Sequence, residues 1–306
     1  ESRRNYEQIA RYMILHTRLD LIMGAGHPDF NDNAETEETN ARWVGGRDFW
    51  NQLRTNDGRV QFEIDGQSFQ LADAGGDGLP DAWTVVESRE DFLSLASGVP
   101  PTRVLGVPKV GATLQQGRNK GEAEVIPFSQ PFNENIPSLE EMTRAAINVL
   151  SQNPAGFFVM IEGGAIDWAS HDGHTGRMIE EQIDFNRAVE AAIEWVDKYS
   201  SWDETLIIVT ADHECGYLTG PDYPAQVYPD VINRGKGELP DTKWNHDSHT
   251  NVLVPFYARG KGQEVFQLMA GESDPVRGPF IQNTQVPQAI FMMWGKPRPE
   301  VFRISH

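Results

Sequence analysis

The sequence is poor in cysteine and in positive charge. Cys215 is the only cysteine among 306 residues, which excludes a disulfide framework within the chain. Lysine and arginine together number 26 against 45 aspartates and glutamates, so the formal net charge is −19 with histidine neutral. Such an acidic chain lacks the basic face with which non-specific nucleic-acid-binding proteins neutralise phosphates, and we expect no nucleic-acid partner.

Long apolar runs are missing as well. No stretch approaches the roughly 18 consecutive apolar residues of a transmembrane helix, so we expect no membrane span. A signal peptide is not visible, because Glu1 opens into a helical pattern without an initiating methionine, and we interpret the chain as a processed or truncated product. The apolar content of 39% nevertheless indicates a packed globule.

Apolar periodicity divides the chain into short elements. Ser138 and Glu141 have the spacing of a capping box, which predicts a helix from there to about Leu150. The pattern predicts further helices over 6–16, 46–54, 89–96, 263–270 and 284–294, strands over 19–23, 83–87, 103–107 and 252–257, and a hairpin over 60–71.

The most informative stretch contains two apolar runs, Phe157–Ile161 and Leu206–Val209, each of which ends abruptly in acidic residues and histidine. Short runs rich in β-branched and aromatic residues are typical of strands buried on both faces, and the segment between them has the spacing of a long amphipathic helix. Strand, helix and strand form a βαβ unit, so we expect the two strands to be parallel, with their carboxyl ends at one edge of a sheet. Ligands of open α/β sheets collect at that edge.

Acidic and imidazole side chains follow both of these predicted strands. They are Glu162, Asp167, His171, Asp212 and His213. Asp167 and His171 are four residues apart, so on a helix they share one face and can chelate one ion. Mixed imidazole and carboxylate ligands suit zinc, whereas an all-carboxylate site suits magnesium. The sequence therefore predicts a divalent metal site.

Three motifs in this order resemble those of the alkaline phosphatase family. Residues 157–171 resemble the family's strand that ends in Glu-Gly-Gly and leads to an aspartate and a histidine, and Thr-Ala-Asp-His at 210–213 resembles its second metal motif. His249-Thr250, shortly before the run 254–260, resembles the third. The resemblance covers nearly the whole chain and is weakest over residues 29–137.

The resemblance implies an α/β fold, with a largely parallel central sheet sandwiched between helices. We expect one such domain over residues 1–306, incomplete at its N-terminal side, with a surface embellishment at about 27–137. The family carries two zinc ions and one magnesium ion per site. Matched residue by residue, Asp167, His171 and His249 would hold the first zinc, Asp212 and His213 the second, and Glu162 the magnesium.

The activity that the resemblance implies is hydrolysis of phosphate monoesters. In that chemistry a serine attacks phosphorus in line and forms a phosphoserine, while two metal ions roughly 4 Å apart stabilise the attacking and leaving oxygens. The family's nucleophilic serine lies in an Asp-Ser-Ala type motif, which does not occur here. Asp247-Ser248 is the only Asp-Ser dipeptide and lies inside the third metal motif, so we do not nominate Ser248. We interpret the chain as lacking the segment with the nucleophile.

Several nearby residues have simpler interpretations. His246 lies three residues before His249 and competes with it as a ligand; we favour His249. His174 is interpreted as a polar helix residue that can approach the site and contact a metal ligand without binding the ion itself. We interpret Cys215, close to the second motif, as a small buried residue rather than a ligand.

An acidic loop offers a separate candidate metal site. Asp73, Asp77 and Asp81 alternate with glycines in a spacing similar to calcium loops, but the terminal glutamate of an EF-hand is absent. A turn built from aspartate, glycine and proline explains the same residues equally well.

Two other functions remain open at this point. The chain is either a catalytically inert metal-binding fragment, or part of a related superfamily hydrolase or mutase that acts on sulfate esters, phosphodiesters or phosphoglycerate. The Glu-Gly-Gly sequence at 162–164 favours the monoesterase. By analogy with the family we expect a periplasmic or extracellular protein. A homodimer, or a complex with the missing N-terminal segment, is a possible assembly.

Overall fold

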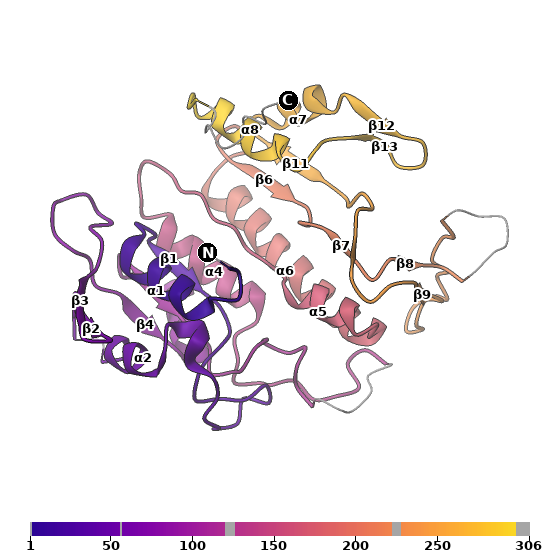
Figure 1. Cartoon of the computed structure of the whole chain (residues 1–306). Coiled ribbons are helices and arrows are strands. Elements are labelled where there is room, and N and C mark those ends of the chain that lie inside the picture. Colours follow the sequence, from indigo (N-terminus) through magenta and orange to yellow (C-terminus); the bar gives the residue numbers. More distant parts are fainter. Residues whose placement is uncertain (1, 56, 120–125, 222–227, 298–306) are drawn as a thin grey trace. The chain divides into compact units, whose positions relative to one another are not determined.

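The computed structural model describes residues 2–55, 57–119, 126–221 and 228–297 (Figure 1). Within these ranges no helix has both the length and the apolar character needed to cross a membrane.

The chain divides into two compact units. The first consists of Glu1–Ala169 with His174–Ala192, and the second of Ser170–Gly173 with Ile193–His306. Helices α5 (Ala165–His171) and α6 (Thr175–Tyr199) each contribute residues to both units. The expected single domain over residues 1–306 stays a prediction.

The first unit contains most of the predicted elements. In chain order they are α1 (Tyr6–His16), β1 (Leu21–Met23), the 3-10 helix η1 (Ala41–Val44), α2 (Arg47–Leu53), β2 (Gln61–Ile64), β3 (Gln67–Gln70), β4 (Thr84–Val86), α3 (Arg89–Ser97), β5 (Val104–Gly106) and α4 (Leu139–Leu150). The helices, strands and hairpin predicted from periodicity in this region are confirmed, and most of their ends lie within two residues of the predicted positions.

A three-stranded parallel sheet in the order β1-β5-β4 lies within the first unit. Leu105 of the central strand pairs with Ile22 of β1 and Val85 of β4. All three residues of β5 are buried, as expected for a central parallel strand covered on both faces. Helix α3 connects β4 to β5, so these elements form a βαβ unit. The α/β class predicted from the sequence is confirmed.

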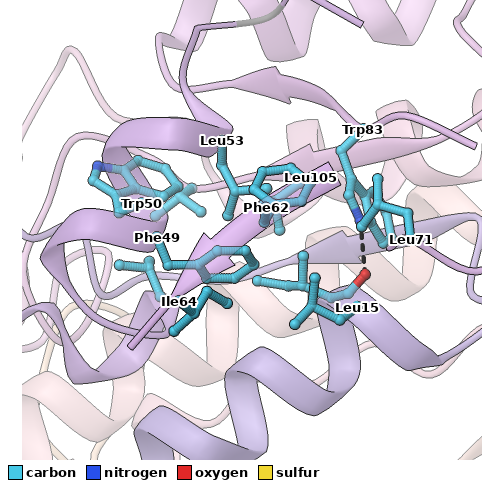
Figure 2. Close-up of a cluster of buried hydrophobic side chains, with 12 residues drawn as sticks. Leu15, Phe49, Trp50, Leu53, Phe62, Ile64, Leu71, Trp83 and Leu105 are labelled. Carbon is cyan, nitrogen blue, oxygen red and sulfur yellow. Dashed lines mark hydrogen bonds between the residues drawn. The ribbon is translucent and has the colours of Figure 1, made fainter. Parts of the chain in front are cut away.

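The main hydrophobic cluster of the first unit joins its helices to its sheet and hairpin. Figure 2 shows these side chains, which include Leu15, Phe49, Trp50, Leu53, Phe62, Ile64, Leu71, Trp83 and Leu105. The indole of Trp83 donates to the carbonyl of Ile14 at 3.0 Å, so its polar atom is satisfied inside the core. Each large side chain buried here contributes about 1.5–3 kcal/mol.

Helix α4 begins with the predicted capping box. The Ser138 hydroxyl accepts the Glu141 amide at 3.2 Å, and the Glu141 carboxylate accepts the Ser138 amide at 3.0 Å. Glu141 also pairs with Arg89 of α3 at 2.6 Å, which ties the two helices together. Both contacts lower the pKa of Glu141, and they outweigh the opposing effect of its partial burial.

The second unit consists of short strands and two helices. After the end of α6 these are β6 (Leu206–Val209), β7 (Glu214–Cys215), β8 (Leu218–Thr219), β9 (Lys243–Trp244), β10 (His249–Thr250), β11 (Tyr257–Gly260), α7 (Gln263–Met269), β12 (Glu272–Asp274), β13 (Gly278–Phe280) and α8 (Gln285–Met293). Every strand pair here is antiparallel among the residues that the structure describes.

Two strand predictions are wrong. Phe157–Ile161 forms no strand, and Met160 is 80% exposed, so the predicted parallel pairing of this run with β6 is absent. Strand β6 pairs instead with β11, which begins at Tyr257, where the predicted strand 252–257 was expected to end. An apolar run reports burial tendency only; a strand also needs a hydrogen-bonded neighbour, which the run itself does not specify.

Candidate metal centre

Helix α5 carries the first pair of predicted ligands. Asp167 and His171 lie one turn apart on this helix, as their spacing predicted. Just before the helix, a Cβ atom on Gly163 would lie 3.0 Å from the Phe185 ring, so a glycine here lets the chain pass close to α6. Glu162, the predicted magnesium ligand, is exposed and belongs to the first unit.

His171 and His249 lie side by side in the second unit. Their Nε2 atoms are 3.1 Å apart, although 78 positions separate them in sequence. The Nδ1 atom of His171 lies 2.7 Å from the carbonyl oxygen of Asp247. Because a carbonyl only accepts, Nδ1 carries the proton, and the Nε2 of a neutral ring then presents its lone pair toward His249.

A short antiparallel ladder positions His249. Strand β10 pairs with β7, and His249 lies directly opposite Cys215. Gly216, which follows Cys215, has a φ of +81°, and a Cβ atom there would lie 2.4 Å from the Trp244 ring. Glycine is therefore required for this close approach. The Gly216 amide donates to the Ser248 carbonyl at 3.1 Å, which holds the two segments in register.

Asp212 and His213 follow strand β6. The Asp212 carboxylate lies 3.3 Å from the Nε2 of His213, so the two predicted ligands converge. The His213 ring stacks on the His249 ring at 3.5 Å between centroids. The Asp212 side chain is 82% exposed, which leaves its oxygens accessible from solvent.

His246 has a different environment from His249. Its Nδ1 accepts the amide of Ser248 at 2.9 Å, so this ring folds back onto its own loop. Of the two histidines, His249 is the one whose ring contacts His171, and its choice as the metal ligand stays a prediction.

The donor atoms of the second unit fit zinc. The ring nitrogens of His171 and His249 and the sulfur of Cys215 all lie within 4.8 Å of one another. Two nitrogen ligands about 2.0–2.1 Å from a tetrahedral zinc ion are separated by about 3.4 Å, close to the spacing of the two Nε2 atoms. The contact from His171 to the Asp247 carbonyl is the outer-shell hydrogen bond that zinc-binding histidines make.

The acidic loop at 73–81 uses its carboxylates internally. Asp73 accepts the amides of Gly76 and Gly78, and Asp81 accepts those of Ala74 and Gly75. The hydrogen bond from Gly78 is the main cause that lowers the pKa of Asp73. These bonds explain the aspartates as turn residues, and calcium binding by Asp73, Asp77 and Asp81 stays a prediction.

Sequence reasoning missed the place of Cys215 among these donors. The interpretation as a small buried residue is wrong in its burial, since Cys215 is only half-buried. Its relation to His249 depends on strand pairing between distant segments, which residue spacing does not reveal. The Asp247 carbonyl was missed because backbone acceptors carry no signal in sequence.

Comparison with known proteins identifies the family. A family model described as alkaline phosphatase matches residues 1–234. The alkaline phosphatase of Escherichia coli (strain K12) is 31% identical over 229 residues, which cover 74% of this chain and 43% of that protein. Alkaline phosphatase 4 of Bacillus subtilis (strain 168) is 49% identical over 83 residues, or 27% of this chain and 17% of that protein. The chain thus spans less than half the length of these curated relatives.

A solved structure has a similar fold. The crystal structure of the cold-active alkaline phosphatase from the psychrophile Shewanella sp. aligns with 97% of this chain and 70% of its own, with a TM-score of 0.58 at 21% identity. The fold of the chain is therefore that of an alkaline phosphatase. Because the family model covers well over half of the sequence, this protein belongs to the alkaline phosphatase family.

Proposed function

We propose that this chain is the metal-binding portion of an enzyme that hydrolyses phosphate monoesters through a phosphoserine intermediate. Family membership supports the reaction class. The observation that carries the proposal is the 3.1 Å contact between His171 and His249, since it unites two of the three motifs that the sequence singled out. The stacking of the His213 ring on the His249 ring, 3.5 Å apart between centroids, adds the remaining motif.

In this proposal the ligands are those expected from the family resemblance. Asp167, His171 and His249 hold one zinc ion, Asp212 and His213 hold a second, and Glu162 holds magnesium. Bound divalent ions supply positive charge that stabilises the oxygens entering and leaving phosphorus. The chain's own contribution is orientation: the Asp247 carbonyl fixes the His171 ring, and the β7–β10 ladder fixes His249.

The proposal places the nucleophilic serine outside this chain. Ser248 is tied by its backbone, because its amide donates to His246 and its carbonyl accepts from Gly216. The limited share of the curated relatives that the chain spans supports a missing segment. We expect no hydrolysis of p-nitrophenyl phosphate by the 306-residue chain with zinc and magnesium added, and activity when the segment carrying the serine is supplied. Turnover by the chain alone would refute this part of the proposal.

Metal content tests the ligand assignment directly. Asp212→Ala is expected to lower the zinc stoichiometry of the chain by one ion and to abolish activity in the complete enzyme. Asp203→Ala, which removes an exposed carboxylate three residues before β6, serves as the matched control and is expected to bind zinc as the wild type does. Unchanged zinc stoichiometry in the Asp212 variant would rule out its role as a ligand.

The same measurements separate the alternatives. A chain that binds zinc but stays inactive with every added segment is the inert metal-binding fragment. Turnover of sulfate esters, phosphodiesters or phosphoglycerate in preference to a phosphate monoester would indicate a related superfamily enzyme. Export to the periplasm or cell exterior, and assembly as a homodimer, stay predictions.

A further inference from the structure

Cys215 lies on the same face of the β7–β10 ladder as His249. Directly opposed residues of an antiparallel pair project their side chains to one side, with Cβ atoms about 4.5–5.5 Å apart. The pairing of Cys215 with His249 therefore directs a sulfur atom toward the ring that meets His171. The three donor atoms lie within 4.8 Å of one another.

The backbone around Cys215 holds the sulfur in this position. Gly216 accepts the amides of Asn245 and His246, each at 3.1 Å, and its own amide donates to Ser248. On the other side of Cys215, the Glu214 carboxylate accepts the Tyr217 amide at 2.6 Å and the Thr250 hydroxyl. Hydrogen bonds of the residues on either side, Glu214 and Gly216, thus fix the backbone of Cys215, which is not part of a hydrophobic cluster.

We propose that Cys215 is a further ligand of the zinc centre, donating a thiolate sulfur to the ion held by His171 and His249. This inference rests on the proposed function, which assigns zinc to those two histidines and Asp167. Zinc lies about 2.3 Å from a thiolate and 2.0–2.1 Å from an imidazole nitrogen, so donors on one ion are at most about 4.4 Å apart. In a tetrahedral site the sulfur and a nitrogen lie about 3.6 Å apart, so side-chain rotations that shorten the widest spacing by about 1 Å place all three atoms on one ion.

Thiolate ligation has a chemical consequence for the choice of metal. The thiol loses its proton when the ion binds, and the sulfur then forms a bond to the metal. A thiolate is a soft ligand, so it favours zinc over magnesium at this position. Metal binding also occupies the lone pair that attacks alkylating reagents, which makes the thiol unreactive while the ion is present.

Cobalt substitution reports the sulfur bond without an activity assay. Co²⁺ bound to a thiolate has an intense near-ultraviolet charge-transfer band, which we expect in the wild-type chain and not in Cys215→Ser with Co²⁺ still bound. His246→Asn, which keeps an acceptor for the Ser248 amide, is the control and is expected to keep the band. Bound Co²⁺ without the band in the wild type would overturn the thiolate ligand alone. Failure of the wild type to bind Co²⁺ would overturn the zinc centre of the proposed function, and the thiolate with it.

Alkylation of the wild-type chain gives a second test that needs no variant. Because Cys215 is the only cysteine, the uptake of iodoacetamide reports this thiol alone. We expect zinc to slow alkylation at least tenfold, and magnesium to leave the rate unchanged. Equal rates with saturating zinc bound and with zinc removed would contradict the proposal.

Discussion

The two units of this protein differ in how they are stabilised. The first has two clusters of buried hydrophobic side chains and a parallel sheet whose central strand is covered on both faces. Among the described residues of the second unit, the buried hydrophobic side chains are Val196, Phe266 and Ala289. The second unit instead brings together ring nitrogens and a sulfur that can share an ion.

The two units also differ in whether their polar side chains pair with one another. In the first unit, Glu180 of α6 accepts hydrogen bonds from Arg118 at 2.9 Å, from Arg177 at 3.2 Å and from the Phe128 amide at 2.6 Å. Each of the three charged side chains is no more than 3% exposed. This cluster satisfies its own members, whereas the histidines of the second unit direct ring nitrogens toward one another. We interpret a cluster whose hydrogen-bonding groups pair with one another as structural, and a cluster whose donor atoms converge on one point as a candidate site.

The largest effect is expected from breaking the buried cluster. Glu180→Gln removes the negative charge between two buried arginines, and such a loss costs about 3–5 kcal/mol of unfolding free energy. Urea denaturation measures it. The control is Glu140→Gln, which breaks a partly exposed pair with Arg144 one helical turn away and costs about 0.5 kcal/mol or less. Equal effects of the two changes would show that the buried cluster contributes no more to stability than a partly exposed ion pair.

The neighbouring carboxyl Glu181 makes the first unit sensitive to pH. Burial raises its pKa to about 7, and the charges of Asp184 and Glu180 act in the same direction, against those of Arg118 and Arg177. The folded state therefore keeps a proton that the unfolded state loses near pH 4.5. This contribution to stability is complete below that pH and is lost as the pH rises through about 7.

Glu181→Gln is accordingly expected to stabilise the chain by about 3 kcal/mol at pH 8 relative to the wild type, with the difference shrinking toward pH 4.5. Urea midpoints at a series of pH values measure this. Glu190→Gln, on an exposed position of the same helix, is the control and should leave the pH profile unchanged. A wild-type stability independent of pH between 5 and 8 would contradict the expectation.

Zinc is expected to stabilise the second unit more than the first, because every proposed zinc ligand except Asp167 lies in the second unit. An ion at about 100 times its dissociation constant adds about 2.7 kcal/mol to the folded state that binds it. Hydrogen exchange of the β7 and β10 amides should slow when zinc is added, while that of β5 in the first unit stays the same. Equal protection of both units by zinc would show that the ion does not compensate for the small core of the second unit.

The smallest effect is expected at the acidic loop of the first unit. Since the Asp73 and Asp81 carboxylates accept backbone amides of their own loop, a calcium chelator with zinc held constant is expected to leave the melting temperature unchanged. A lowered melting temperature on chelation would instead support calcium binding. Asp73→Ala should lower the midpoint slightly through loss of the loop's hydrogen bonds.

Local features of the fold were predictable from sequence, because they depend on residues close in the chain. The Ser138–Glu141 capping box, the strand–helix–strand unit around α3 and the one-turn spacing of Asp167 and His171 are all of this kind. The failure at Phe157–Ile161 has the opposite cause, because a strand depends on a partner elsewhere. His249 was predicted through motif resemblance, and the position of Cys215 became visible only with the pairing of β7 and β10.

That two-residue ladder also constrains how the protein can change. Successive residues of a strand point to opposite sides, so a slip of a single residue would turn Cys215 or His249 away from His171. Insertions between positions 216 and 248 are therefore compatible with the centre when the loop absorbs them. They are harmful when they shift the pairing, because a shift of one residue turns a side chain away and a shift of two moves it about 7 Å along the strand. The metal centre depends on the exact register of this pairing, and hardly at all on the length of the intervening segment.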